Sequence, residues 1–279
     1  MTVWTLAGCV MFLVTLPGAQ ADEDVTAVYS KVMSKDYSRT KLPDGSYKPE
    51  EYFLKNGGRY DKPSGDASMD NKRFPDIARV IVEQLGTQNY RPGTDPQKGK
   101  LIIVVYWGTS ITPNSSTSHG MERAQDITQD LNGNHLRLFG DYDMGQITFD
   151  QDDHNMTDLR NSAMLGYDWV KIHAAPPKFG NLYPEDQQLL NELEGERYFV
   201  VLLAYDCQAF LKAKKYKELW ETRLSISTSD TDFTKALPKM AKDASSYFGR
   251  DSNGLQHLPE GRVNVGETKS LGEVEAPQK

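Results

Sequence analysis

Residues 198–205 (YFVVLLAY) form the segment that most restricts the fold of this chain. Both alternating faces of this run are apolar. A half-exposed strand would alternate apolar with polar residues, so a doubly apolar run is typical of a strand covered on both sides. The sequence therefore predicts a central strand here. A second run of the same kind, residues 101–107 (LIIVVYW), predicts its neighbour in the sheet.

The residues after the central strand predict a partner strand, joined to it through a lysine-rich turn. In residues 219–228, Trp220, Leu224 and Ile226 share one face, and the other face is polar. This period of two is expected for a strand with one wet face. We therefore expect it to pair antiparallel with residues 198–205.

Two amphipathic helices are expected to cover this sheet. Apolar residues recur at three- and four-residue steps in residues 74–85 and again in residues 233–248, where Gly249 can cap the end. Pro238 lacks a backbone donor, so the second helix either kinks there or begins near Leu237.

These elements predict an α+β fold for a single domain over residues 71–265. The expected architecture is a two-layer sandwich of a mixed or antiparallel sheet with both helices on one face. Before the domain, a signal peptide is predicted at residues 1–21 and a mostly irregular lead-in, with one short strand near 51–54, at residues 22–70. A helical insertion is predicted within the domain at residues 108–195, and a disordered tail after it at residues 266–279.

The insertion, residues 108–195, is expected to be a layer added to a complete core. Helices are predicted at residues 121–131, 158–172 and 185–193, and a last strand after the domain's final helix at 262–265. Loop closure costs only about 0.6 kcal/mol per doubling of length. We therefore expect a folded core to survive replacement of residues 109–194 by a short linker.

Residues 1–21 predict export of the protein. They contain no charged side chain, carry an apolar run and end in Ala19-Gln20-Ala21, a small-x-small cleavage pattern, so the mature chain should begin at Asp22. The segment lacks a basic start. Retention as an N-terminal membrane anchor is the alternative if the signal is not cleaved.

The overall charge argues against broad nucleic-acid binding. The formal net charge is -7 and the chain average is acidic, with a sequence pI near 5.3, whereas phosphate contacts need a basic face. The one strong basic spot is Lys212, Lys214, Lys215 and Lys217, which either protects a turn or touches an anionic lipid or glycan surface.

An acidic cluster in the insertion is the candidate metal site. Asp141, Asp143, Asp152 and His154 bring hard oxygen ligands and an imidazole into one segment, and calcium is the ion such carboxylates prefer. The spacing does not match a helix-loop-helix calcium site. A solvated acidic loop without any cofactor is the competing interpretation, and the one we favour.

Cys207 is the cysteine left after signal removal, and we expect a buried, inert thiol. Phosphate loops, nucleophile elbows, zinc helices and Cys-x-x-Cys pairs are absent from the sequence, so no catalytic residue is predicted.

Two segments resemble uncharacterised exported proteins of Gram-negative bacteria, including envelope lipoproteins of unknown function. The resemblance lies in an amphipathic helix before LIIVVYWG (residues 74–108) and in a strand beginning Leu219-Trp220 before a C-terminal helix (residues 197–249). It implies an α+β domain in the periplasm or cell envelope. Cys9 lies before the apolar core of the leader and so departs from the lipoprotein members.

The sequence therefore favours an exported, non-catalytic envelope protein of structural or ligand-binding type. It does not identify the partner, for which an envelope surface and another protein are the candidates. A metal-assisted hydrolase using the acidic insertion is the alternative.

Overall fold

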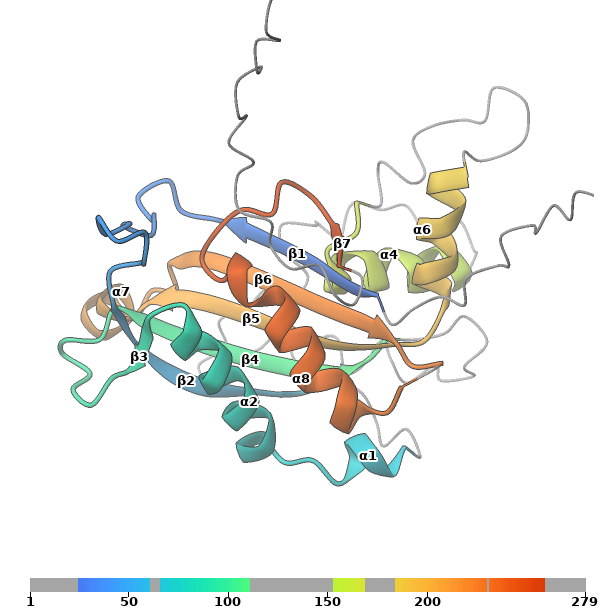
Figure 1. The fold of residues 1–279 in the computed structure, drawn as a ribbon, viewed down its shortest axis with the longest axis horizontal. Coiled ribbons are helices and arrows are strands. Elements are labelled where there is room, and N and C mark those ends of the chain that lie inside the picture. Colours follow the sequence, from blue (N-terminus) through green and yellow to red (C-terminus); the bar gives the residue numbers. More distant parts are fainter. Residues whose placement is uncertain (1–24, 61–65, 111–152, 169–183, 230, 259–279) are drawn as a thin grey trace, which may run out of the picture.

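A seven-stranded mixed sheet forms the centre of the molecule (Figure 1). The computed structural model describes residues 25–60, 66–110, 153–168, 184–229 and 231–258. The strands lie in the order β3-β2-β4-β5-β6-β1-β7. β2 pairs in parallel with β3 and β4, and the pairs from β4 to β7 are antiparallel. The predicted α+β class is confirmed.

The two doubly apolar runs are neighbours at the middle of the sheet. They are β4 (Leu101–Thr109) and β5 (Arg197–Asp206), paired from Leu101 opposite Asp206 to Thr109 opposite Tyr198. The predicted partner strand is β6 (Glu218–Ser227), antiparallel to β5 as expected. β5 and β6 are connected by a short helix, α7 (Cys207–Ala213), in place of a simple turn.

Helices α2 (Phe74–Thr87) and α8 (Phe233–Ala244) lie side by side on one face of the sheet (Figure 1). They pack with alternate residues of β5, among them Val200 and Leu202, in a first hydrophobic cluster. At the start of α2 the Arg73 backbone N–H donates to the Asp76 carboxylate at 3.1 Å. Pro75 lies in the first turn of the helix, where the missing donor costs nothing.

Helix α8 begins at Phe233, after the N-cap Asp232, and contains Pro238. The sequence left open a start near Leu237, and the cap geometry decides against it because the Asp232 carboxylate accepts from Lys235 N. The helix continues into a 3-10 turn, η1 (Ser245–Tyr247), and ends before Gly249 at φ +71°.

Two strands lie in the segment expected to be a mostly irregular lead-in. β1 (Thr26–Val32) enters the sheet between β6 and β7, and β2 (Glu50–Arg59) pairs with β4. The second matches the short strand expected near 51–54 and is longer. The prediction that the domain begins at residue 71 is therefore wrong, because β1 and β2 supply strands to both halves of the sheet.

The remaining described elements are α1 (Ala67–Asp70), β3 (Tyr90–Pro92) and β7 (Gln256–Leu258). β7 is the last strand of the described chain. The strand predicted at residues 262–265, the helix predicted at 121–131 and the tail at 266–279 lie outside the described residues.

The insertion supplies the second hydrophobic cluster of the domain. Its described helices are α4 (Asp153–Leu165) and α6 (Pro184–Glu194). α6 matches the helix predicted at 185–193, whereas α4 begins five residues before and ends seven residues before the helix predicted at 158–172. Met164 and Leu193 are buried against Phe199, Val201 and Leu203, which point to the face of β5 opposite α2 and α8. Both faces of β5 are therefore apolar because each is covered by helices, α2 and α8 on one face and α4 and α6 on the other.

The packing of these side chains on β5 argues against the expectation that the insertion is separable from the core. Deleting residues 109–194 removes the buried side chains of Ala163, Met164, Leu165 and Leu193 together. Each large buried side chain is worth about 2–5 kcal/mol, and the stability of a whole domain is about 5–15 kcal/mol.

We predict that a chain in which residues 109–194 are replaced by a short Gly/Ser linker shows no cooperative thermal unfolding. Circular dichroism on heating would measure it, with the full chain as the control. A sharp transition in the deletion variant would show that α4 and α6 are dispensable to the core.

Candidate functional site

The predicted metal ligands are not brought together in the described part of the chain. Asp141, Asp143 and Asp152 lie outside the described residues, and His154 lies in the first turn of α4, where its side chain is not described. Among the described residues, no group of three or more candidate ligands is close enough to hold a metal ion. The favoured interpretation, a solvated acidic loop, and its alternative, calcium binding, therefore both stay untested predictions.

Cys207 is buried at the start of α7, as expected for an inert thiol. Its Sγ lies 3.7 Å from the Pro96 carbonyl oxygen, and burial, with the Asp206 charge, raises the pKa of the thiol. A raised pKa disfavours the nucleophilic thiolate.

The polar face of β6 is buried, so the prediction of a wet face is wrong. Glu221, Arg223 and Ser225 are each at most 5% exposed because α4 covers them. Arg223 Nη2 lies 2.7 Å from the Glu221 carboxylate, and Arg223 Nη1 donates to the Met164 carbonyl at 3.0 Å. Charged side chains on this face therefore pair with one another and with the covering helix.

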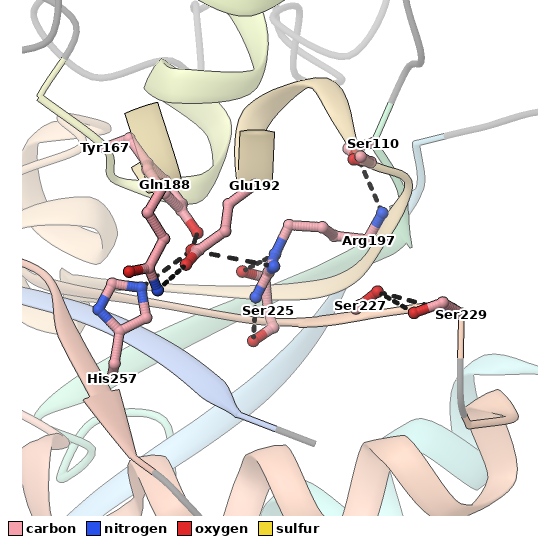
Figure 2. Close-up of polar contacts among 10 residues, drawn as sticks. Ser110, Tyr167, Gln188, Glu192, Arg197, Ser225, Ser227, Ser229 and His257 are labelled. Atoms are coloured by element: carbon pink, nitrogen blue, oxygen red, sulfur yellow. Dashed lines mark hydrogen bonds and ion pairs between the residues drawn. The ribbon is translucent and has the colours of Figure 1, made fainter. Parts of the chain in front are cut away.

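A further polar cluster, on the face of the sheet that α4 and α6 cover, is shown in Figure 2. We call it the Glu192 cluster. Its members are Tyr167 after α4, Gln188 and Glu192 on α6, Arg197 on β5, Ser225 on β6 and His257 on β7.

Glu192 is the centre of the cluster. Its Oε2 accepts a hydrogen bond from Tyr167 Oη at 2.6 Å and lies 2.9 Å from His257 Nε2 and 4.0 Å from Arg197 Nη1. Gln188 Nε2 donates to Oε1 at 3.4 Å. The Arg197 guanidinium also donates to the hydroxyl and carbonyl oxygens of Ser225. The Glu192 carboxylate on α6 therefore connects β5, β7 and the segment that follows α4.

The cluster favours the ionised form of Glu192. Burial alone would raise the pKa of this carboxyl group, but the hydrogen bonds from His257 and Tyr167 and the Arg197 charge outweigh it and hold the pKa below its usual value. Burial raises the pKa of Tyr167, which therefore stays protonated and acts as a donor.

The Glu192–His257 pair has the form of an acid–base unit, because a carboxylate that fixes an imidazole nitrogen leaves the other nitrogen to exchange protons. A hydrolytic site also needs a nucleophile or water in reach of the imidazole. In the described part of the chain, the His257 ring hydrogen-bonds to Glu192, and the Ser225 hydroxyl accepts from Arg197 Nε. The described geometry is that of a structural tie between β7 and the helices.

A second polar cluster, around Glu50, ties segments of the fold together on the face of the sheet that α2 and α8 cover. The buried Glu50 accepts from Tyr37 Oη at 2.9 Å and pairs with Lys100 Nζ at 2.6 Å. Arg39 stacks over the ring of Tyr90 at 3.9 Å, and its Nη2 donates to the Gln88 carbonyl at 2.6 Å. This cluster fixes the segment between β1 and β2 against the core.

Sequence reasoning missed both clusters. The members of the Glu192 cluster come from widely separated positions without motif spacing, so no local pattern joins them. The one available signal was the row of polar residues on β6, which was interpreted as solvent-facing.

The charge of Glu192 should stabilise the fold. We predict that Glu192→Gln lowers the free energy of unfolding by about 2 kcal/mol at pH 7, because it leaves Arg197 and His257 without their carboxylate. The pKa of Glu192 is depressed in the folded state, so its contribution is complete above pH 4.5 and is lost as the pH falls below that value. Urea unfolding at neutral pH and well below pH 4.5 would measure the difference.

Glu194→Gln is the matched control, since Glu194 is exposed on the same helix. An equal loss of stability in this control, or a loss for Glu192→Gln that does not shrink in acid, would contradict the assigned role of Glu192.

Comparison with known proteins gives no family assignment. No protein-family model matches the chain, and no curated protein matches its sequence. Among the described helices, none is both long and apolar enough to cross a membrane.

Proposed function

We propose that this protein is an exported, non-catalytic component of the cell envelope, of structural or ligand-binding type. The leader-like residues 1–21 and the resemblance to exported envelope proteins support the location. The pairing of the buried acids with neighbouring side chains supports the non-catalytic role.

The observation that carries the proposal is that three acids of the described chain, buried or largely buried, are each bound by neighbouring side chains. Glu50 is bound by Tyr37 and Lys100, Glu192 by Tyr167 and His257, and Glu221 by Arg223. A catalytic carboxylate must reach a substrate or a water molecule. Glu50 and Glu221 are 7% and 5% exposed. Lys100 pairs with Oε1 of Glu50 and Tyr37 donates to its Oε2, while Arg223 pairs with Oε2 of Glu221.

These ties also suit a protein that acts through its surface. They fix loops and strand ends to a rigid sheet, and a rigid scaffold presents its exposed side chains in one arrangement. The function then resides in surface contacts, with the buried polar clusters maintaining their geometry.

Analysis of the protein recovered from its natural host would test this function. We expect it in the envelope fraction, beginning at Asp22, and without bound metal in elemental analysis. A mature chain that begins at Met1 in the cytoplasmic fraction would contradict export.

Bound metal that is lost in the variant Asp141→Asn/Asp143→Asn would contradict the non-catalytic role and favour the metal-assisted hydrolase. The matched control is Asp243→Asn, which removes one carboxylate from α8, far in sequence from the acidic insertion.

A further inference from the structure

The end of the sheet where β5 passes into α7 gathers lysines from three separate segments. We call it the lysine end. Its members are Lys35, Lys98, Lys212, Lys214, Lys215 and Lys217, and all are exposed. In Figure 1 the turns on either side of α7 lie at this same end of the molecule.

Specific contacts hold these segments together. Gln208 Nε2 on α7 donates to the carbonyl oxygens of Gln97 and Gly99, each at 3.0 Å, and so fixes the turn that carries Lys98. Lys217 Nζ lies 3.0 Å from the Asp36 carboxylate, which fixes the turn that carries Lys35. The lysine end is therefore a product of the fold, and the run at 212–217 is only part of it.

Positive charge is in excess at this end. Asp95 pairs with Lys98 and Asp36 with Lys217. Two further acids lie nearby, Asp206 at the N-cap of α7 and Glu218 at the start of β6, so the six lysines outnumber these four carboxylates. Among the described residues, no carboxylate lies within ion-pair distance of the other four lysines, although the whole chain carries a formal charge of -7.

Partly exposed apolar side chains lie among these lysines. Phe210, Leu211 and Tyr216 are half-buried. The rings of Phe210 and Tyr216 are 5.0 Å apart, and Lys214 Nζ lies 5.3 Å from the Phe210 ring centroid. A basic surface that also presents aromatic and aliphatic groups is typical of proteins that bind the membrane interface.

The needs of folding do not account for this surface. Lys214 caps α7 at φ 53°, a left-handed conformation that glycine adopts without strain. The helix dipole favours positive charge at this end of α7. That explanation does not extend to Lys35 and Lys98, which belong to other segments.

We propose that the lysine end docks on a membrane surface that carries anionic phospholipid headgroups. The lysine ammonium groups are attracted to the lipid phosphates, while Phe210 and Leu211 enter the boundary between headgroups and acyl chains. The inference takes its biological setting from the proposed envelope location and adds the surface and the class of partner.

The test is co-sedimentation of the full chain with vesicles made of phosphatidylcholine and phosphatidylglycerol in equal parts. Each lysine near an anionic surface strengthens binding about fivefold, so Lys212→Gln/Lys214→Gln/Lys215→Gln should weaken it on the order of 100-fold. Binding should also weaken with rising salt and be lost on pure phosphatidylcholine.

The matched control is Arg79→Gln/Lys235→Gln/Lys242→Gln, which removes the same charge from exposed positions on α2 and α8. It should bind as the unmodified chain does. All variants keep residues 1–21, so any contribution of that apolar segment is common to them, and thermal unfolding checks that each is folded.

Equal weakening in the two triple variants, or no binding to anionic vesicles, would overturn the proposal. Binding to dextran sulfate without binding to the vesicles would also overturn it, in favour of an anionic polysaccharide partner. Because purified protein is used, these outcomes do not depend on whether the chain is exported from its host.

Discussion

The burial of β5 on both faces is the constraint on which the rest of the structure depends. Residues of this strand alternate between two hydrophobic clusters, and neither face can be left in water. One cluster is closed by α2 and α8, and the other by α4 and α6. The segment between β4 and β5 is therefore as necessary to the core as the helices that follow β6.

Covering the second face creates an electrostatic difficulty, since β6 and the start of β5 present Glu221, Arg223 and Arg197 to it. Charges removed from water are costly unless they are paired and hydrogen-bonded. The structure meets this requirement with the Glu221–Arg223 pair and the Glu192 cluster. The same contacts connect β7 to α6, so the final described strand of the sheet is held by the insertion.

The sequence predicted the elements whose patterns are local and strong. The runs that became β4 and β5 and the stripes of α2 and α8 are each contained within a short window, so periodicity was sufficient. β1 was missed because its buried members include the polar residues Thr26 and Ser30, which bond to Asp243, Thr222 and Ser252 more than 190 residues away. Such partners leave no local signal.

The candidate site was less predictable than the fold. The polar face of β6 has the period of a half-exposed strand, and whether water or a helix covers it depends on where α4 packs. Tyr167, Glu192 and His257 likewise meet only after the sheet has formed. By contrast, the lysine run at 212–217 was evident in the sequence, and the fold enlarges it with Lys35 and Lys98.

Native-state hydrogen exchange would test most directly that both helical layers and the sheet form one cooperative unit. The account predicts that the amides of β5, α8 and α4 exchange through the same global opening, with the same dependence on denaturant. Exchange of the α4 and α6 amides through a smaller opening that leaves β5 and α8 protected would contradict it, because the second layer would then be separable from the core.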